Sequence, residues 1–166
     1  MSKSMWMVRA GEGGVRVEEF RAGSLVAIGW QQVGDMSALR TREQFSKAVE
    51  KAYPASRRMQ LAMSAGQAYR FVREIKVGDR VATYDPSRRE YLVGTITGEY
   101  VFRPGPEDGY PQVRTVNWSA TVSRDALSIA TRNSLGAIAT LFQVPAEAAE
   151  EIERLTAGGV PPNAPD

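Results

Sequence analysis

Aromatic side chains near the ends of expected strands are the residues of this sequence best suited to recognition chemistry. The rings in such positions are those of Trp6, Trp30, Trp118, Tyr69, Tyr84 and Tyr100. At the rim of a barrel they could hold one unstacked base, since each base–ring stack contributes about 1–3 kcal/mol; alternatively, each ring fills the core. Trp30 is the strongest pocket candidate, because the polar residues Gln31 and Gln32 follow it directly.

Two polar residues shortly after Trp30 could supply hydrogen bonds in the same pocket. Asp35 could accept a hydrogen bond from the exocyclic amine of a flipped base, and Ser37 could make a similar contact. The alternative is that Asp35 and Ser37 are ordinary turn or helix-capping residues. The sequence leaves both interpretations open.

Arginine carries most of the positive charge of this chain, whose formal net charge is +2. The planar guanidinium group can bind phosphate oxygens through two parallel hydrogen bonds, so an arginine-rich surface favours a nucleic-acid partner. The residues that we expect to contact the DNA backbone are Arg9, Arg57, Arg58, Arg70, Arg88 and Arg89.

An enzymatic alternative depends on Glu74 and Lys76, whose spacing matches half of the catalytic motif of Mg²⁺-dependent nucleases. The other half would be a carboxylate on a neighbouring strand, and Asp35 is distant in sequence. We therefore interpret Glu74 and Lys76 as the edge of a strand that enters a turn. The absence of histidine and cysteine excludes thiolate metal sites and histidine-dependent hydrolases. We predict no catalytic residue, no metal site and no cofactor.

Short strands and four helices are expected to position these side chains. Alternating or buried apolar runs predict strands at residues 6–9, 15–20, 25–30, 69–75, 80–85, 91–97, 99–102 and 113–118. Helices are expected from a cap at Ser37 or Thr41 to Pro54, at 56–70, at 128–138 after Ser123 or Ser128, and at 145–155. Strands at this spacing favour a small closed or half-closed barrel.

The length of 166 residues suits one domain, which we place at residues 1–156. The proline- and glycine-rich residues 157–166 have the composition of a linker or tail. No apolar stretch approaches the roughly 20 residues of a membrane span, and no secretory signal is visible, so we expect a cytoplasmic protein without a membrane partner.

Several motifs together carry a family resemblance over about residues 5–155. They lie at residues 6–11, 26–30, 34–37, 71–79, 81–85, 91–94 and 132–136, and the most specific is the turn Ile75-x-x-Gly78-Asp79-x-Val81. In these motifs the chain resembles the amino-terminal region of Mrr-like restriction endonucleases. That region looks like an EVE-type domain of the PUA superfamily, which implies an α+β fold with a small β-barrel of five to six strands flanked by helices.

The resemblance implies recognition of a modified base. EVE and related YTH domains hold such a base in an aromatic cage, and in restriction systems they are fused to a nuclease domain. By this resemblance the chain would bind double-stranded DNA that carries a methylated or hydroxymethylated cytosine or a methyladenine, and a nuclease domain beyond Asp166 would cut it. Trp30 matches a cage aromatic, and Asp35 with Ser37 matches the loop at the base edge; Trp6, Tyr69, Tyr84 and Trp118 are further cage candidates.

Two alternatives remain open from the sequence. The first is an RNA-binding or small-ligand-binding domain of the PUA type without a restriction role. The second is a Mg²⁺-dependent nuclease that uses Glu74 and Lys76. The oligomeric state is not predicted.

Overall fold

A curled sheet of seven strands forms the centre of the computed structural model, which describes residues 3–105 and 109–157. The strand order is β2-β6-β4-β3-β1-β7, with the short β5 paired to β6, and only the β1–β3 pair is parallel. The strands are β1 Met5–Val8, β2 Leu25–Ile28, β3 Arg80–Asp85, β4 Glu90–Ile96, β5 Val101–Phe102, β6 Gln112–Ser123 and β7 Leu141–Gln143.

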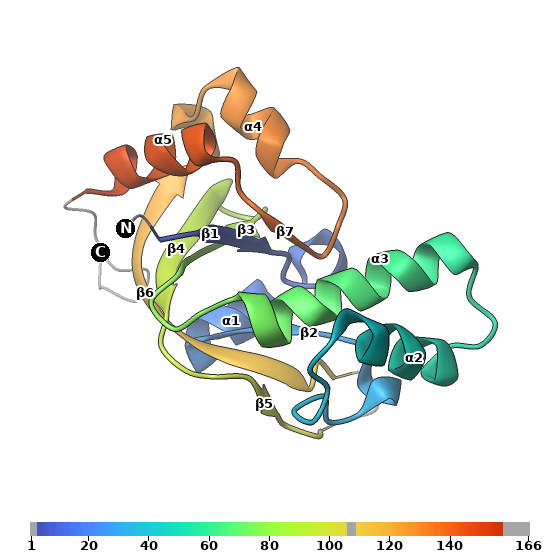
Figure 1. Ribbon diagram of the computed structural model, residues 1–166. Helices are drawn as coiled ribbons and strands as arrows, with labels where there is room; N and C mark the ends of the chain where they lie inside the picture. Colours follow the sequence, from blue (N-terminus) through green and yellow to red (C-terminus); the bar gives the residue numbers. More distant parts are fainter. Residues whose placement is uncertain (1–2, 106–108, 158–166) are drawn as a thin grey trace.

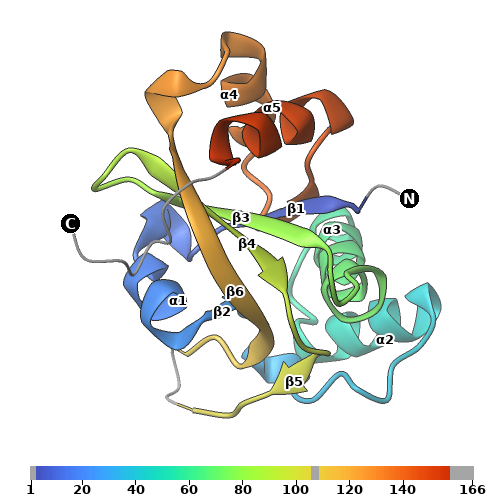
Figure 2. The ribbon, with the colours of Figure 1, turned by 90° about the vertical axis from the view of Figure 1, so that its left-hand side faces the viewer.

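Five α-helices flank this half-barrel in the described residues: α1 Val17–Gly23, α2 Arg42–Ala52, α3 Arg58–Tyr69, α4 Ile129–Leu135 and α5 Ala146–Thr156. Helices α2 and α3 pack together on one side of the sheet, while α4 and α5 lie together at another edge (Figures 1 and 2). None of the described helices is both long enough and apolar enough to cross a membrane. The predicted α+β class with a small barrel flanked by helices is confirmed, and the sheet has seven strands instead of five to six.

Three apolar clusters hold these layers together. The largest fills the barrel and includes Phe20, Phe71 and Leu92. A second lies where α4 and α5 cover the sheet, around Tyr91 and Ile152. A third lies between α2 and α3, so the helical pair has a core of its own beside the barrel.

Two segments predicted as strands are helical. Residues 15–20 show a two-residue alternation, but the buried side chains of Val17, Phe20 and Arg21 follow helical spacing and form one face of α1. Residues 70–74 continue α3 as a π-helical turn, Arg70–Glu74, which buries Phe71 and Val72. In both segments apolar residues occur too close together in sequence for periodicity alone to separate a strand from a helix.

The predicted helix starts are largely confirmed. Thr41 forms a capping box with Gln44 at the start of α2, and the Ser128 hydroxyl accepts a hydrogen bond from the Thr131 amide at the start of α4. Pro145 precedes α5. Strand β7 was missed because it has three residues. The tail at 157–166 was predicted as a linker, and residues 158–166 of it lie outside the described part.

Candidate functional site

Trp30 lies in a turn with an unusual backbone conformation directly after β2. Its φ and ψ angles are 51° and 41°, in the left-handed region. That conformation costs an L-residue roughly 1–2 kcal/mol, so the surrounding structure has to hold it in place. The turn continues through the 3₁₀ helix Gln31–Val33 to Gly34, whose φ of 77° suits glycine.

The side chain of Gln112, the first residue of β6, fixes this turn. Gln112 is fully buried, and its amide nitrogen lies 3.4 Å from the Trp30 carbonyl oxygen and 3.0 Å from that of Gly34. The Tyr100 hydroxyl donates to Oε1 of Gln112 and accepts a hydrogen bond of 2.9 Å from the Met36 amide. These contacts fix the orientation of the Gln112 amide group. The strained turn is therefore held by a hydrogen-bond network centred on the buried Gln112.

The Trp30 side chain lines a pocket of about 350 Å³ between β2 and the α2–α3 pair. Volumes of this size are at the lower end of the range for small-ligand sites. Three aromatic rings line the pocket, those of Trp30, Tyr53 and Tyr110. The other lining residues are Gly29, Gln31, Val49, Ser56, Gln60, Leu61, Ser64 and Thr140, so no charged residue lines it.

Tyr53 and Tyr110 come to this pocket from segments that are far apart in sequence. Tyr53 directly follows α2, and burial raises the pKa of its phenol against the effect of a hydrogen bond from the Gln32 backbone. Tyr110 lies over Gly29, where an added methyl group would be 3.5 Å from its ring. The guanidinium of Arg16 is 4.0 Å from the centroid of the Tyr110 ring, a cation–π contact.

Sequence reasoning missed Tyr53 and Tyr110 as pocket residues. Phe45, Val49 and Tyr53 are four residues apart, a spacing that predicts a buried helix face. The spacing does not indicate that Tyr53 borders a cavity. Tyr110 follows a loop rich in glycine and proline, and no periodicity marks it. Only the folded chain brings both rings to Trp30.

Trp6 and Trp118 fill the core, which is the alternative that the sequence left open for each. The exposed fractions of Trp6 and Trp118 are 3% and 6%. Their indole N–H groups donate to a carboxylate oxygen of Asp79 at 3.0 Å and to the Phe20 carbonyl at 2.9 Å. With the rings buried and the polar atoms paired, neither side chain is placed to contact a ligand.

The remaining pocket candidates are dispersed. Asp35 is an exposed turn residue whose Oδ1 accepts the Ser37 amide at 2.9 Å, and neither residue lines the Trp30 pocket. Tyr69 packs edge-on against Phe45, with centroids 5.5 Å apart, and belongs to the helical core. Tyr84 lines a different pocket. Of the seven residues predicted for the pocket, the structure places only Trp30 in this one.

The predicted phosphate-binding arginines fall into separate groups. Arg57 and Arg58 are exposed at the start of α3, the helix that gives Gln60, Leu61 and Ser64 to the Trp30 pocket. Arg88 and Arg89 lie in the β3–β4 turn, where Arg89 pairs with Asp125 at 2.7 Å and Arg88 lies 4.0 Å from Asp85 and Glu90. Arg9 is at the end of β1, and Arg70 is half-buried in the π-helical turn.

The nuclease candidates do not gather into a metal site. A carboxylate oxygen of Glu74 pairs with Arg42 at 2.8 Å, and the backbone amide of Lys76 donates to Asp79 at 2.9 Å. Across residues 3–105 and 109–157, no three acidic side chains lie close enough together to bind a metal ion. Glu74 and Lys76 lie at the end of a helical turn, not on a strand edge as predicted.

Comparison with known proteins gives a family without an assigned activity. No curated protein matches the chain. A solved protein from Agrobacterium tumefaciens, Atu2648, aligns over 98% of this chain and 99% of its own with 15% identity and a TM-score of 0.46. A hypothetical protein from Leishmania major aligns over 95% and 96% with 12% identity and a TM-score of 0.43. The model of one family, described as a domain of unknown function (DUF8426), matches residues 6–144. The chain belongs to that family.

Proposed function

We propose that this chain recognises a modified base in DNA, a methylated or hydroxymethylated cytosine or a methyladenine, which is extruded from the duplex into the pocket of Trp30, Tyr53 and Tyr110. One observation carries the proposal: a partly exposed tryptophan is held in a strained backbone conformation by a hydrogen-bond network centred on the buried Gln112, and it lines an aromatic pocket without charged residues. Backbone strain that the surrounding structure maintains is typical of functional sites.

The chemistry of the pocket lining suits a nucleobase. A base is neutral and flat, and it carries hydrogen-bond donors and acceptors on its edges. The rings supply stacking surfaces, and the polar side chains supply partners for the edges. Among the described residues, the side chains of Gln60 and Ser64 make no hydrogen bond, so these two groups are available to a ligand.

The apolar part of the lining could favour a methylated base over the unmethylated one. Burying one methyl contributes only about 0.8 kcal/mol, so strong selectivity requires a close-fitting wall or a lost hydrogen bond. Leu61 of α3 is partly exposed and provides apolar surface, and the buried Val49 of α2 also borders the pocket. Stacking on the rings at about 1–3 kcal/mol per base would offset the few kcal/mol that extrusion costs.

Positive charge beside the pocket supports a DNA partner. Arg57 and Arg58 follow Ser56, which lines the pocket, and both side chains are exposed. They could bind phosphates on either side of an extruded nucleotide. In this proposal the chain is the recognition part of a modification-dependent restriction system, without catalytic residues of its own, and a fused or associated nuclease domain cuts the DNA.

The experiment is a titration of the purified protein at one moderate salt concentration against matched duplexes. The duplexes carry cytosine, 5-methylcytosine, 5-hydroxymethylcytosine or N6-methyladenine, and RNA of the same sequence is included. We expect one modified duplex to bind at least about tenfold more tightly than the unmodified one, and Trp30→Ala to remove that preference, in line with a loss of 1–3 kcal/mol of stacking.

A matched control is Met59→Ala, because Met59 is 77% exposed on α3 near the pocket but is not part of its lining. Its preference should equal that of the wild type. Equal binding to every duplex, unaffected by Trp30→Ala, would overturn the proposal. Tighter binding to RNA would favour the RNA-binding alternative.

A further inference from the structure

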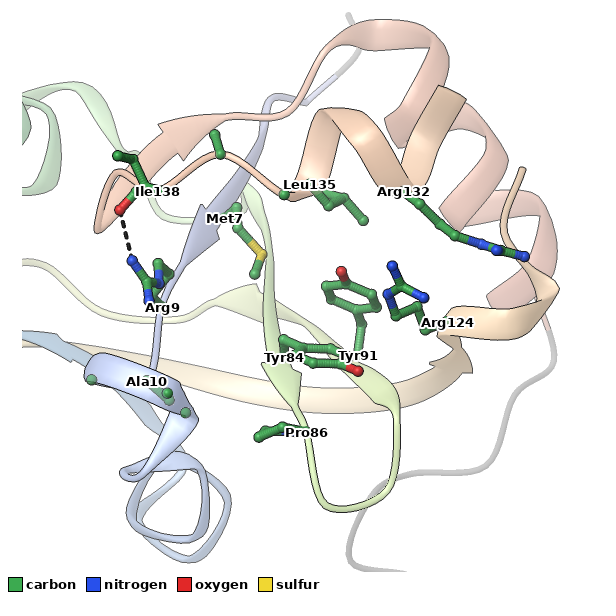
Figure 3. A pocket seen from close by; sticks show the side chains of 15 residues that line it. Met7, Arg9, Ala10, Tyr84, Pro86, Tyr91, Arg124, Arg132, Leu135 and Ile138 are labelled. Atoms are coloured by element: carbon green, nitrogen blue, oxygen red, sulfur yellow. Dashed lines mark hydrogen bonds between the residues drawn. The ribbon is translucent and has the colours of Figure 1, made fainter. Parts of the chain in front are cut away.

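A second pocket, of about 330 Å³, differs from the first in its charge. It lies between the end of β1, the glycine-rich loop at residues 11–14, the β3–β4 turn and residues 124–138 (Figure 3). Its lining includes three arginines, Arg9, Arg124 and Arg132, and no acidic residue. The two pockets share no lining residue. A cationic pocket of this size suits a small anionic ligand.

The three guanidinium groups differ in what they contact. Arg132 donates to the carbonyls of Leu127 and Asp125 at 3.0 and 3.2 Å. Arg9 donates through one nitrogen to the Ile138 carbonyl at 2.6 Å (Figure 3) and retains further donors. The side chain of Arg124 makes no hydrogen bond or ion pair with any residue in the described part of the chain. Because Arg124 is half-buried and pairs directly with no carboxylate in that part, its charge is neither fully solvated nor held in an ion pair, although Asp125 lies close enough to feel it.

Two tyrosine rings lie between the arginines. Tyr84 and Tyr91 are 4.7 Å apart between centroids, and Arg9 and Arg124 lie on opposite sides of this pair (Figure 3). Tyr91 is buried, which raises the pKa of its phenol; Tyr84 raises this pKa further and the charge of Arg124 opposes the rise. The Tyr84 ring is partly exposed and offers a flat surface to the pocket. Cationic groups beside an exposed ring are typical of nucleotide-binding surfaces.

The glycine-rich loop forms the remaining wall. A methyl group on Gly14 would lie 2.6 Å from the Pro86 ring, so the loop packs directly against the β3–β4 turn. A methyl group on Gly13, whose φ is 67°, would meet nothing within 4 Å. The wall at Gly13 is therefore backbone without a covering side chain, and a ligand can approach the main chain there.

We propose that this pocket binds a nucleoside phosphate, with the phosphate on Arg124 and the ring system on Tyr84. The phosphate gives the Arg124 guanidinium a direct ion-pair partner, and Arg9 provides a second cation on the other side of the tyrosine rings. A nucleoside phosphate can be either a free nucleotide or one nucleotide of a DNA strand. The inference does not rest on the proposed base-recognition function, because the residues of the two pockets are different.

Calorimetric titration with mononucleotides, the matching nucleosides, inorganic phosphate and a short single-stranded DNA tests this site. We expect a mononucleotide or the strand to bind at least tenfold more tightly than the nucleoside or inorganic phosphate. Arg124→Ala and the uncharged, polar Arg124→Gln should each weaken that binding at least tenfold. Arg40→Ala, which removes an exposed arginine from outside the pocket, should bind like the wild type.

The outcomes distinguish a free nucleotide from a DNA strand as the ligand, and they distinguish this proposal from the base-recognition proposal. Mononucleotide binding that depends on Arg124 indicates a free nucleotide, while binding of the strand alone with the same dependence indicates a nucleic acid. Base recognition is tested by its dependence on Trp30 and this site by its dependence on Arg124, so a failure here and a failure of the base-recognition proposal are distinguishable. Binding of neither ligand, or binding that both Arg124 variants retain in full, would overturn the inference.

Discussion

The side-chain amide of Gln112 lies within hydrogen-bonding distance of the carbonyl oxygens of Trp30 and Gly34, the two ends of the turn that presents the indole. Gln112 belongs to β6 and pairs in register with Ile28 of β2 and Phe102 of β5. The turn that follows β2 is thus fixed by a residue of β6, the strand that pairs with both β2 and β5. A buried polar side chain in the barrel thereby determines the position of an aromatic ring at its rim.

Replacing Gln112 should affect both stability and recognition. Gln112→Met keeps a similar volume but leaves the carbonyls of Trp30 and Gly34 without a donor, which costs roughly 1–3 kcal/mol of unfolding free energy. Denaturant unfolding followed by tryptophan fluorescence measures that loss. The preference for modified DNA should fall with it, since the Trp30 turn is no longer held. A variant with wild-type stability and wild-type preference would show that this contact is unimportant.

Tyr100 should make the protein sensitive to alkaline pH. Burial raises the pKa of Tyr100 to about 12, while the amide of Met36 lowers it and the charge of Asp35 raises it. An unfolded tyrosine titrates near 10. The stabilising contribution is therefore complete below about pH 10 and is lost as the pH rises toward about 12. Phenolate absorbance should include a contribution near pH 12 that Tyr100→Phe lacks; an unchanged titration in that variant would contradict the assignment.

Much of the fold could be predicted from the sequence, because local signals and tertiary packing agree there. The apolar runs at 25–28 and 80–85 and the caps at Thr41 and Ser128 specify their elements directly. Residues 15–20 and 69–75 could not be assigned correctly. Their buried faces are defined by contacts with the barrel interior, and a short apolar run fits a strand as well as a helix.

Asp85 and Arg21 form a buried ion pair that should govern stability in acid. Their charged atoms are 2.6 Å apart, and Asp85 is fully buried. Burial opposes ionisation of Asp85, but hydrogen bonds from Arg21, Ser87 and Arg88 outweigh it and lower the pKa. The stabilisation is therefore present above the ordinary carboxyl pKa of about 4 and is lost as the pH falls below it.

The matched variants are Asp85→Asn and Asp125→Asn. Asp85→Asn should cost on the order of 3 kcal/mol at neutral pH and flatten the acid dependence, because it removes the buried counter-ion of Arg21 and leaves only the exposed Glu18. Asp125 pairs with Arg89 at an exposed position, so Asp125→Asn should change stability little. Unfolding free energies at several pH values provide the comparison. Equal losses in the two variants would show that the buried pair contributes no more than the exposed one.

Arg114 should be essential for stability, although by its residue type it belongs with the phosphate-binding candidates. It is fully buried and donates to the carbonyls of Gly98, Phe71 and Ile75 at 2.8–2.9 Å. Arg114→Met leaves these carbonyls without a donor and should destabilise the protein by about 3 kcal/mol or more. Arg154→Met, at an exposed position, is the control. Thermal unfolding measures both, and similar midpoints would contradict this role.

The candidate site was harder to predict than the fold. Trp30 could be singled out because polar residues follow it, whereas Trp6 and Trp118, which also lie on expected strands, turn out to be buried in the core. Burial of an indole depends on the layers packed around it, which no local pattern reports. Tyr53 and Tyr110 are 57 residues apart in sequence, and they meet at one pocket only because α2 packs against the turn at residues 31–33, directly after Trp30.

The most direct test of the central claim is whether the modified base leaves the helix. The fluorescent base 2-aminopurine is placed next to the modified base in the preferred duplex, where stacking quenches its emission. Saturating wild-type protein should raise the emission, because extrusion of the neighbour unstacks the probe, and Trp30→Ala should not. A duplex that is fully bound by the wild-type protein while its emission stays at the unbound level would contradict the claim.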